Sequence, residues 1–467
     1  MTSEKVTMPK RNALSSIDIE TNIPSERRKL ILALTWPALA ENLLASLVSM
    51  ADTIMVSSLG TYAMSAVGLV TQPRFIMLSA FMALGVGTTA LVARARGQRD
   101  PEQANNALVQ SLILSVVFIL ILCAVMLIFL EPLIRFIAGS DLAEQTIQAG
   151  IDYFRIQLYG FPLLGLTFTM NAALRGVGNT RAGFYSNTAA NLVNICFNYC
   201  LINGHLGFPA LGVAGASIAT VIGQGVAFVF CLYLLLNGKQ YIRLRPREIK
   251  VDLKMMKRIG RVGFPAVGEQ VAMRVGNLLF TMIATSLGDV QYAAHIAAMN
   301  VQQLAWNVGM SFGTASTTLT GQSLGRNRPD LARAYMLTAQ KIALGVSLVI
   351  TVLFIVGGRF ICSWYSSDAQ IIALASQMLL IIALANPLSN GRFIYTAALR
   401  GAGDAKFSAI LTLVGIMLLR PIVSIVMINF FHTGLTGLWI SLVSDAVVGF
   451  LLASLRWRGG KWASIQV

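Results

Sequence analysis

The chain has 467 residues, of which 55% are hydrophobic and only 12% are charged, and its mean hydropathy is +0.68. About a quarter of the residues of a water-soluble globular protein are charged, so this composition excludes that class and indicates an integral membrane protein. The net charge of +16 would also suit a nucleic-acid-binding protein. The distribution of the basic residues along the chain distinguishes that class from a membrane protein.

Twelve apolar stretches approach or exceed the ~20 residues that a membrane-spanning helix needs. In chain order they lie at 30–57, 62–93, 104–130, 149–174, 183–203, 211–237, 259–286, 290–320, 334–357, 369–398, 406–430 and 436–455. The sequence therefore predicts an all-α membrane protein with twelve transmembrane helices. Residues 1–29 are polar and lack the apolar core of a cleavable signal peptide, so we expect them to remain as a tail.

The basic residues lie on one side of the predicted membrane topology. Lys and Arg gather in both tails and in every second connection, whereas the alternate connections contain only Arg135 and Arg359. By the positive-inside rule, this pattern predicts a protein of the cell membrane with both termini in the cytoplasm. The charge is thus a topology signal, and no nucleic-acid partner is expected. The basic linker 238–258 is expected to lie against anionic lipid headgroups, which makes membrane lipids partners of the chain.

An internal repeat divides the chain into two halves. At an offset of 228 residues, Pro37–Glu41 matches Pro265–Glu269, and at an offset of 225 Ala172–Arg181 matches Ala397–Lys406. Six spans separate equivalent points, so both copies have the same orientation in the membrane. We predict two six-helix bundles, 30–237 and 259–455, followed by a cytoplasmic tail at 456–467. Parallel repeats of this kind occur in transporters that expose a central site alternately to the two sides.

Two carboxylates in the first span, Glu41 and Asp52, are eleven residues apart. That spacing places them on one face of a helix, about 16 Å apart along its axis. A charged side chain facing lipid at the helix centre costs about 2.5–3.5 kcal/mol. We therefore expect both acids to face a polar cavity, and either Asp52 or Glu41 to bind the coupling ion.

The fifth span carries four amides on one face, and these are the strongest candidates to bind a coupling ion beside Asp52. They are Asn187, Asn191, Asn194 and Asn198. Their carbonyl oxygens suit Na⁺ or a proton-bearing water, and the alternative is hydrogen bonding between helices. At the 225-residue offset, Leu419 and Val423 replace the last two amides, so the stripe is predicted for the first half only.

Other intramembrane side chains are candidates for a substrate cavity. They are Glu41, Glu269, Gln72, Asn300, Met273, Phe280 and Trp306. Flexible methionines and aromatic rings suit varied amphipathic ligands, although ordinary helix packing also uses them. The two glutamates instead have a structural interpretation as buried acids paired with an intramembrane arginine, for which Arg74, Arg274, Arg392 and Arg420 are available. Asp445 has no acidic partner in the repeat.

The remaining reactive residue types suggest no catalytic or metal centre. The five cysteines fall mostly within spans and show no paired spacing, and the three histidines lack metal-ligand spacing. In the repeated Ala-Leu-Arg-Gly-x-Gly motifs, Arg175 and Arg400 precede glycines that are expected to end helices. We expect each arginine to bond the last carbonyls of its helix or lipid phosphates.

Several motifs together resemble the multidrug and toxic compound extrusion (MATE) transporters. They are Ala51–Gly60 (ADTIMVSSLG), Phe312–Ala332 (FGTASTTLTGQSLGRNRPDLA) and the two glycine-rich turns. The resemblance covers essentially the whole chain after residue 29. It implies export of organic, often cationic and amphipathic compounds, driven by inward H⁺ or Na⁺, with Asp52 as a coupling acid and Asn194 and Asn198 beside it.

We therefore expect a monomeric secondary antiporter for small, cationic amphipathic compounds, with H⁺ or Na⁺ as the coupling ion and no other cofactor. The only metal site considered is Na⁺ at Asp52, Asn194 and Asn198. A lipid or lipid-linked oligosaccharide flippase is the alternative, because such proteins also have many spans and a basic interior. An enzyme is not expected, because the sequence lacks a nucleophile and base in catalytic spacing.

Overall fold

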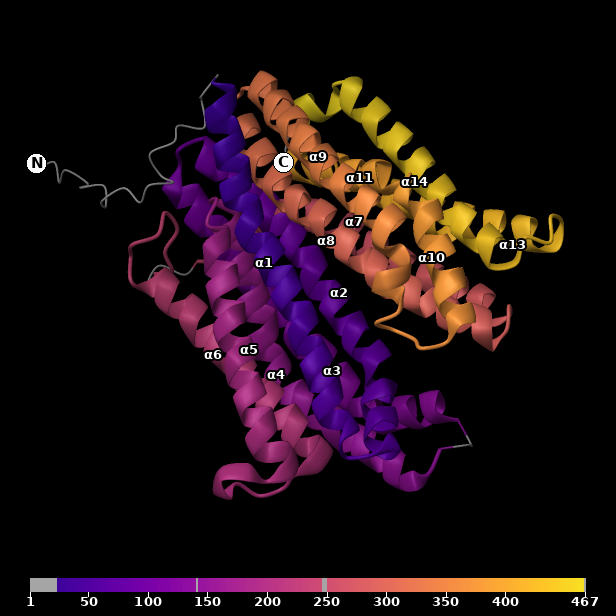
Figure 1. The fold of residues 1–467 in the computed structure, drawn as a ribbon. Helices are drawn as coiled ribbons and strands as arrows, with labels where there is room; N and C mark the ends of the chain where they lie inside the picture. The colour runs from indigo at the N-terminus through magenta and orange to yellow at the C-terminus, as the bar shows by residue number, and fades with distance from the viewer. Residues whose placement is uncertain (1–22, 140–141, 246–249, 466–467) are drawn as a thin grey trace, which may run out of the picture.

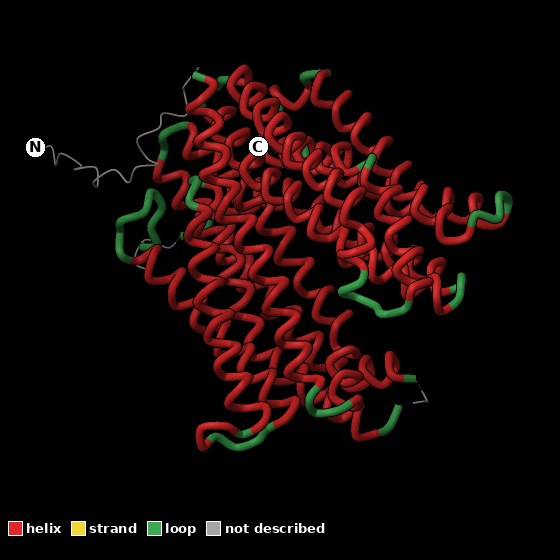
Figure 2. Tube along the Cα trace, viewed as in Figure 1, coloured by secondary structure: helices red, strands yellow, loops and turns green. Residues whose placement is uncertain are grey.

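The computed structural model describes residues 23–139, 142–245 and 250–465, and within them the chain is built of helices joined by short loops (Figures 1 and 2). The first half contains six long helices. They are α1 (Pro24–Ser57), α2 (Thr61–Gly97), α3 (Pro101–Ala138), α4 (Glu144–Gly176), α5 (Thr180–Asn203) and α6 (Gly212–Leu236), with a short 3₁₀ turn, η1 (His205–Gly207), before α6.

The second half repeats this order with two interruptions. Its elements are α7 (Leu253–Thr285), α8 (Asp289–Gly325), α9 (Pro329–Cys362), α10 (Ala369–Ala383), α11 (Asn386–Ala402), α12 (Ala405–Thr412), η3 (Leu413–Leu419), α13 (Arg420–Asn429), α14 (Gly434–Arg458) and η4 (Lys461–Ser464). Helices α10 and α11 form one span bent by 55°. Elements α12, η3 and α13 form one continuous span in which η3 is a π-helix. The two halves thus fit the predicted twelve-helix, two-bundle fold.

Length and hydropathy alone would recover seven spans, or eight with the bent pair, among the described residues. Spans such as α5 and α7 fall short because they carry several amides or guanidinium groups, which other helices cover. Helix α1 begins at Pro24, six residues before the predicted span, because proline suits the first turn of a helix. The predicted tail 1–29 otherwise lies outside the described residues.

Each half forms one lobe, α1–α6 (the N-lobe) and α7–α14 (the C-lobe), and Figure 1 shows the lobes meeting at one end and diverging at the other. We call the end at which α1 begins the closed end. There, Gly97 of α2 lies against the backbone of Gln322, and Gly325 of α8 lies against the backbone of Arg94. These contacts are related by the 228-residue repeat, so an approximate two-fold axis passes between the glycines.

Hydrogen bonds between the lobes close the same end. The Gln322 side chain donates to the Gly176 carbonyl at 2.8 Å, and the Thr318 hydroxyl donates to the Arg175 carbonyl at 3.0 Å. Arg94 donates to the carbonyl of Ile465 at 2.9 Å, which ties the C-terminal segment to α2. The carbonyls at the end of α4, which have no partner within their own helix, are thereby satisfied across the interface.

We expect Gly97→Ala to open the closed end. A Cβ at this position would overlap the main-chain oxygen of Gln322, so the helices must separate, at a cost of about 1–3 kcal/mol. Gly68→Ala on the same helix is the matched control, because its Cβ would meet no atom within 4 Å. Thermal unfolding in detergent should show a lower midpoint for Gly97→Ala only. Equal midpoints for the two variants would contradict the tight contact.

Candidate functional site: a polar cavity in the N-lobe

The N-lobe encloses a cavity of about 490 Å³ between α1, α2, α4, α5 and α6. All four asparagines of the predicted stripe line it, together with Asp52. Their spacing on α5 places them on one face of that helix, as the sequence predicts. The remaining wall is largely apolar. The lining residues used below are Ser49, Val56, Met64, Arg74, Phe75, Leu164, Thr167, Asn194, Asn198, Thr220 and Gly223.

Asp52 is held by the amides of α5. Asn198 donates from Nδ2 to Asp52 Oδ1 at 2.7 Å. In the amide orientation that satisfies both polar atoms of Asn194, its Nδ2 donates to the same oxygen at 3.0 Å, and its side-chain oxygen accepts from the Thr220 N–H at 3.2 Å. Asp52 is half-buried, and it forms no ion pair within the described residues. A carboxylate positioned by neutral donors remains free to bind a proton or a cation.

A buried acceptor beside Asp52 has no partner. The Oδ1 atom of Asn198 makes no hydrogen bond, although only 2% of the residue is exposed. A buried amide oxygen without a donor is costly, so such an atom normally faces an ion or water. Together with the Asp52 carboxylate it provides the oxygen chemistry that suits Na⁺ or a protonated water. Among the described residues, no group of three His, Cys, Asp or Glu side chains could hold a metal ion.

Glu41 lies apart from Asp52. Its Oε1 accepts a hydrogen bond from Asn187 Nδ2 at 2.6 Å, and the residue is half-buried. It does not belong to the lining of the cavity, whereas Asn187 does. The structure therefore links Glu41 to the cavity through an amide rather than bringing the two acids of α1 together.

The repeat partner of Glu41 has a different environment. Glu269 is 5% exposed, and it accepts from Arg400 Nη1 at 2.8 Å and from Thr412 Oγ1 at 3.4 Å. This corrects two expectations, because Arg400 pairs with a carboxylate instead of with helix-end carbonyls or lipid. The partner of Glu269 is also none of the four arginines that the sequence suggested. Arg400 and Glu269 are 131 residues apart, so no local sequence pattern indicates that they pair.

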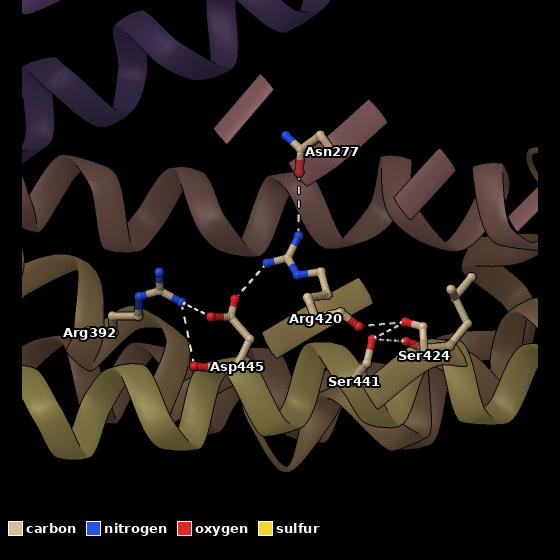
Figure 3. A network of polar contacts seen from close by, with 7 residues as sticks. Asn277, Arg392, Arg420, Ser424, Ser441 and Asp445 are labelled. Carbon is tan, nitrogen blue, oxygen red and sulfur yellow. Dashed lines mark hydrogen bonds and ion pairs between the residues drawn. The ribbon is translucent and has the colours of Figure 1, made fainter. Parts of the chain in front are cut away.

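The C-lobe buries a second polar cluster, shown in Figure 3. Asp445 of α14 is 2% exposed. One of its carboxylate oxygens accepts from Arg392 Nη1 and the other from Arg420 Nη2, each at 2.7 Å. Arg420 also donates to Asn277 Oδ1 at 3.3 Å, and its main-chain oxygen accepts from the Ser424 hydroxyl at 2.8 Å. The carboxylate thus has two permanent cationic partners.

The π-helix changes how the two lobes correspond. Helix α5 has 24 residues, whereas the equivalent span Ala405–Asn429 has 25. A π-turn accommodates one extra residue, so beyond η3 the offset becomes 226. Asn194 then corresponds to Arg420, and the sequence-based match of the last two amides to Leu419 and Val423 is wrong. No hydropathy pattern reveals a one-residue insertion inside an apolar helix.

Five members of the C-lobe cluster correspond to residues that line the N-lobe cavity. Helices α6 and α14 both have 25 residues, which pairs their starts at an offset of 222. The pairs are Ser49 with Asn277, Thr167 with Arg392, Asn194 with Arg420, Asn198 with Ser424, and Gly223 with Asp445. Side chains of opposite charge therefore fill the part of the C-lobe that is hollow in the N-lobe. Unlike Asp445, Asp52 is not bonded to a cationic side chain within the described residues.

The other predicted cavity residues are scattered. Gln72 and Asn300 are exposed on α2 and α8, and Met273 and Trp306 are half-buried. Phe280 is 3% exposed and packs edge-on against His295 at 5.5 Å between ring centroids, so it belongs to the C-lobe core and not to a cavity. Sequence reasoning considered Arg74 only as a partner for a glutamate, yet it lines the cavity with Asp52. The sequence feature that could have identified Arg74 as a cavity residue is a single guanidinium group in the middle of an apolar span.

Comparison with known proteins agrees with this architecture. The MatE family model matches residues 37–200 and 265–426, one match in each lobe. A protein of Thermotoga maritima called "Probable multidrug resistance protein NorM" is 29% identical over 439 residues, which cover 94% of this chain and 93% of that protein. A protein of Shewanella oneidensis called "FAD transporter" is 24% identical and covers 88% of this chain and 90% of its own length.

A solved structure described as the outward-facing conformation of a multidrug resistance MATE family transporter has a TM-score of 0.88 with 25% identity, covering 96% of this chain and 99% of that one. The family match extends over both lobes, the relatives align over nearly their whole length, and the repeat and the cavity fit the same plan. The chain therefore belongs to the MATE family of transporters.

Proposed function

We propose that this protein is a secondary antiporter that exports small amphipathic organic compounds in exchange for H⁺ or Na⁺ by alternating access. The observation that carries the proposal is the contrast between two aspartates within the membrane spans, Asp52 and Asp445. Asp52 borders a cavity and is held by neutral amides, whereas Asp445 is bound to two guanidinium groups. An ion can replace water at Asp52, but it cannot displace arginines that belong to the chain.

The proposed direction of transport follows from the shape and the charge of the molecule. The basic loops lie at the closed end, and the positive-inside rule supports an orientation in which that end and both termini are on the cytoplasmic side of a plasma membrane. In this orientation the diverging ends of the lobes face outward. The cavity would take up the coupling ion from outside and receive substrate from inside after the lobes have rocked.

One coupling ion per cycle is energetically sufficient. A single positive charge that moves inward across ~100 mV supplies about 2.3 kcal/mol, and each 1.4 kcal/mol maintains about a tenfold gradient. The arrangement of one exchangeable carboxylate and one permanently paired carboxylate supports this stoichiometry.

The proposal is tested in proteoliposomes that contain the full chain and a fluorescent drug-like dye. A pH gradient and a Na⁺ gradient are imposed separately, with valinomycin and K⁺ clamping the membrane potential. We expect one gradient to drive dye movement against its concentration gradient, and the dye to collapse the driving gradient in turn. If neither gradient drives dye beyond the level of protein-free vesicles, the antiport proposal is wrong.

A further inference from the structure

One charged side chain in the N-lobe cavity has no partner. Arg74 of α2 lines the cavity, and within the described part of the chain it forms neither a hydrogen bond nor an ion pair. It lies near enough to Asp52 to act on it electrostatically, yet it is not bound to that carboxylate. The cavity therefore presents one exchangeable anion and one free cation.

The other intramembrane arginines show that this is unusual for the molecule. Arg392 and Arg420 contact Asp445, and Arg400 contacts Glu269, each pair within 2.8 Å. An unpaired guanidinium in a membrane span costs several kcal/mol unless water or an anion meets it. The chain pairs these three with its own carboxylates and leaves Arg74 facing the hollow region.

A second guanidinium group without a carboxylate lies at the same part of the lobe interface. Arg274 of α7 in the C-lobe stacks over the ring of Phe75 at 4.2 Å from its centroid. Its buried Nε has no hydrogen-bond partner. Phe75 follows Arg74 in the chain and also lines the cavity. A guanidinium group of the C-lobe thus lies against a residue that lines the N-lobe cavity.

The rest of the lining defines the shape of a suitable ligand. Val56, Met64 and Leu164 supply apolar wall, and Asp52 offers a negative group beside the amides of α5. A ligand that satisfies all of these features has an apolar body, a cationic group and an acidic group. A purely cationic ligand would leave Arg74 unpaired and would bring a second positive charge next to it.

We infer that Arg74 is an anion-binding group of the substrate cavity, and that the compounds this transporter prefers are amphipathic zwitterions whose carboxylate or other acidic group binds Arg74. This inference rests on the proposed export function and specifies its substrate class. The cationic group of the substrate approaches Asp52, where the coupling ion competes with it. Arg274 reaches the same acidic group from the C-lobe when the lobes are apposed.

The test uses two rhodamines that share one chromophore. The first has a free carboxylate and is a zwitterion, and the second is its methyl ester and is only a cation. Binding to the purified full-length protein in detergent is measured by fluorescence anisotropy, which does not require transport. We expect the acid to bind at least about tenfold more tightly than the ester, because charge-assisted hydrogen bonds to an arginine that lines a cavity contribute that much.

Variants of Arg74 assign the preference to its guanidinium group. Arg74→Gln should weaken binding of the acid by about 10- to 100-fold and change binding of the ester less than about threefold. Arg74→Lys should restore part of the affinity for the acid. Arg135→Gln is the matched control, since this arginine is exposed and pairs with Glu131 and Glu144 outside the cavity. If Arg74→Gln does not fold, the affinities of the wild-type protein and of Arg74→Lys for the acid and the ester still test whether Arg74 binds the carboxylate.

Several outcomes would overturn the inference. Tighter binding of the ester by the wild-type protein is one, and equal weakening of both dyes by Arg74→Gln is another. Displacement of the acid by phosphatidylglycerol, but not by a soluble organic carboxylate, would assign Arg74 to lipid phosphate instead. Failure of gradient-driven movement for both dyes would contradict antiport, while the binding comparison would still judge the role of Arg74.

Discussion

Asp52→Asn is expected to reduce gradient-driven dye movement in proteoliposomes to the level of protein-free vesicles. The amide cannot bind or release a proton and has no charge for a cation, so the exchange step loses its coupling group. Hydrogen bonding to Asn198 and Asn194 can persist with an amide flip, and the cavity keeps its shape. Because the cationic group of the substrate also approaches Asp52, dye binding in detergent should weaken and should no longer depend on the coupling ion.

The control for this variant is Asp152→Asn. Asp152 lies outside the cavity, and its side chain is 47% exposed, accepts a hydrogen bond from Gln148 Nε2 at 3.2 Å and has a long contact of 3.7 Å with Arg155. That variant should move dye at the wild-type rate. Full gradient-driven movement by Asp52→Asn would show that the coupling ion binds elsewhere. Dye binding that is unchanged and still depends on the coupling ion would show that the substrate does not approach Asp52 either.

Asp445→Asn is expected to have the largest effect on stability. The substitution leaves Arg392 and Arg420 buried without a counter-charge, and breaking a buried ion pair in this way costs about 3–5 kcal/mol. Ser424→Ala in the same cluster removes an uncharged hydroxyl that lies within hydrogen-bond distance of the Arg420 main-chain oxygen and the Ser441 hydroxyl, so it should cost about 1 kcal/mol. Thermal unfolding in detergent, followed by tryptophan fluorescence, compares the two.

Arg420→Met tests whether one arginine is enough to neutralise Asp445 in that cluster. The variant leaves Arg392 and Asp445 as a one-to-one pair, so it should unfold at a higher temperature than Asp445→Asn. If Asp445→Asn unfolds at the wild-type temperature, the cluster does not hold the C-lobe together, and its aspartate is free to exchange partners. The assignment of coupling to the N-lobe alone would then fail.

The arrangement of helices was predictable because lipid imposes a strong local rule. Each span must be long, apolar and hydrogen-bonded within itself, so composition and hydropathy identify most helices one at a time. The repeat adds their grouping, since equal order in two halves implies equal folds. The face shared by Asp52 and the α5 asparagines was also predictable, because helical periodicity fixes which residues of one helix point the same way.

The partners of the charged side chains were not predictable in this way. Glu269 and Arg400 are 131 residues apart, and Asp445 meets Arg392 across 53 residues. Contacts of this kind depend on how helices rotate and slide against each other, and a single π-turn in η3 shifts every later contact by one residue. Because of this one-residue shift, Arg420 in the C-lobe is equivalent in position to Asn194 in the N-lobe.

The sequence by itself determined the membrane class, the duplicated six-helix plan and the acidic and amide face of the N-lobe, because these follow from hydropathy, periodicity and repetition along the chain. Only the tertiary structure decided that Asp52 and not Glu41 lines the cavity, that Asp445 is bound by two arginines and that Arg74 has no hydrogen-bond or ion-pair partner among the described residues. Those differences depend on packing between distant helices, where a charge is either neutralised by the chain or left for an ion or a ligand.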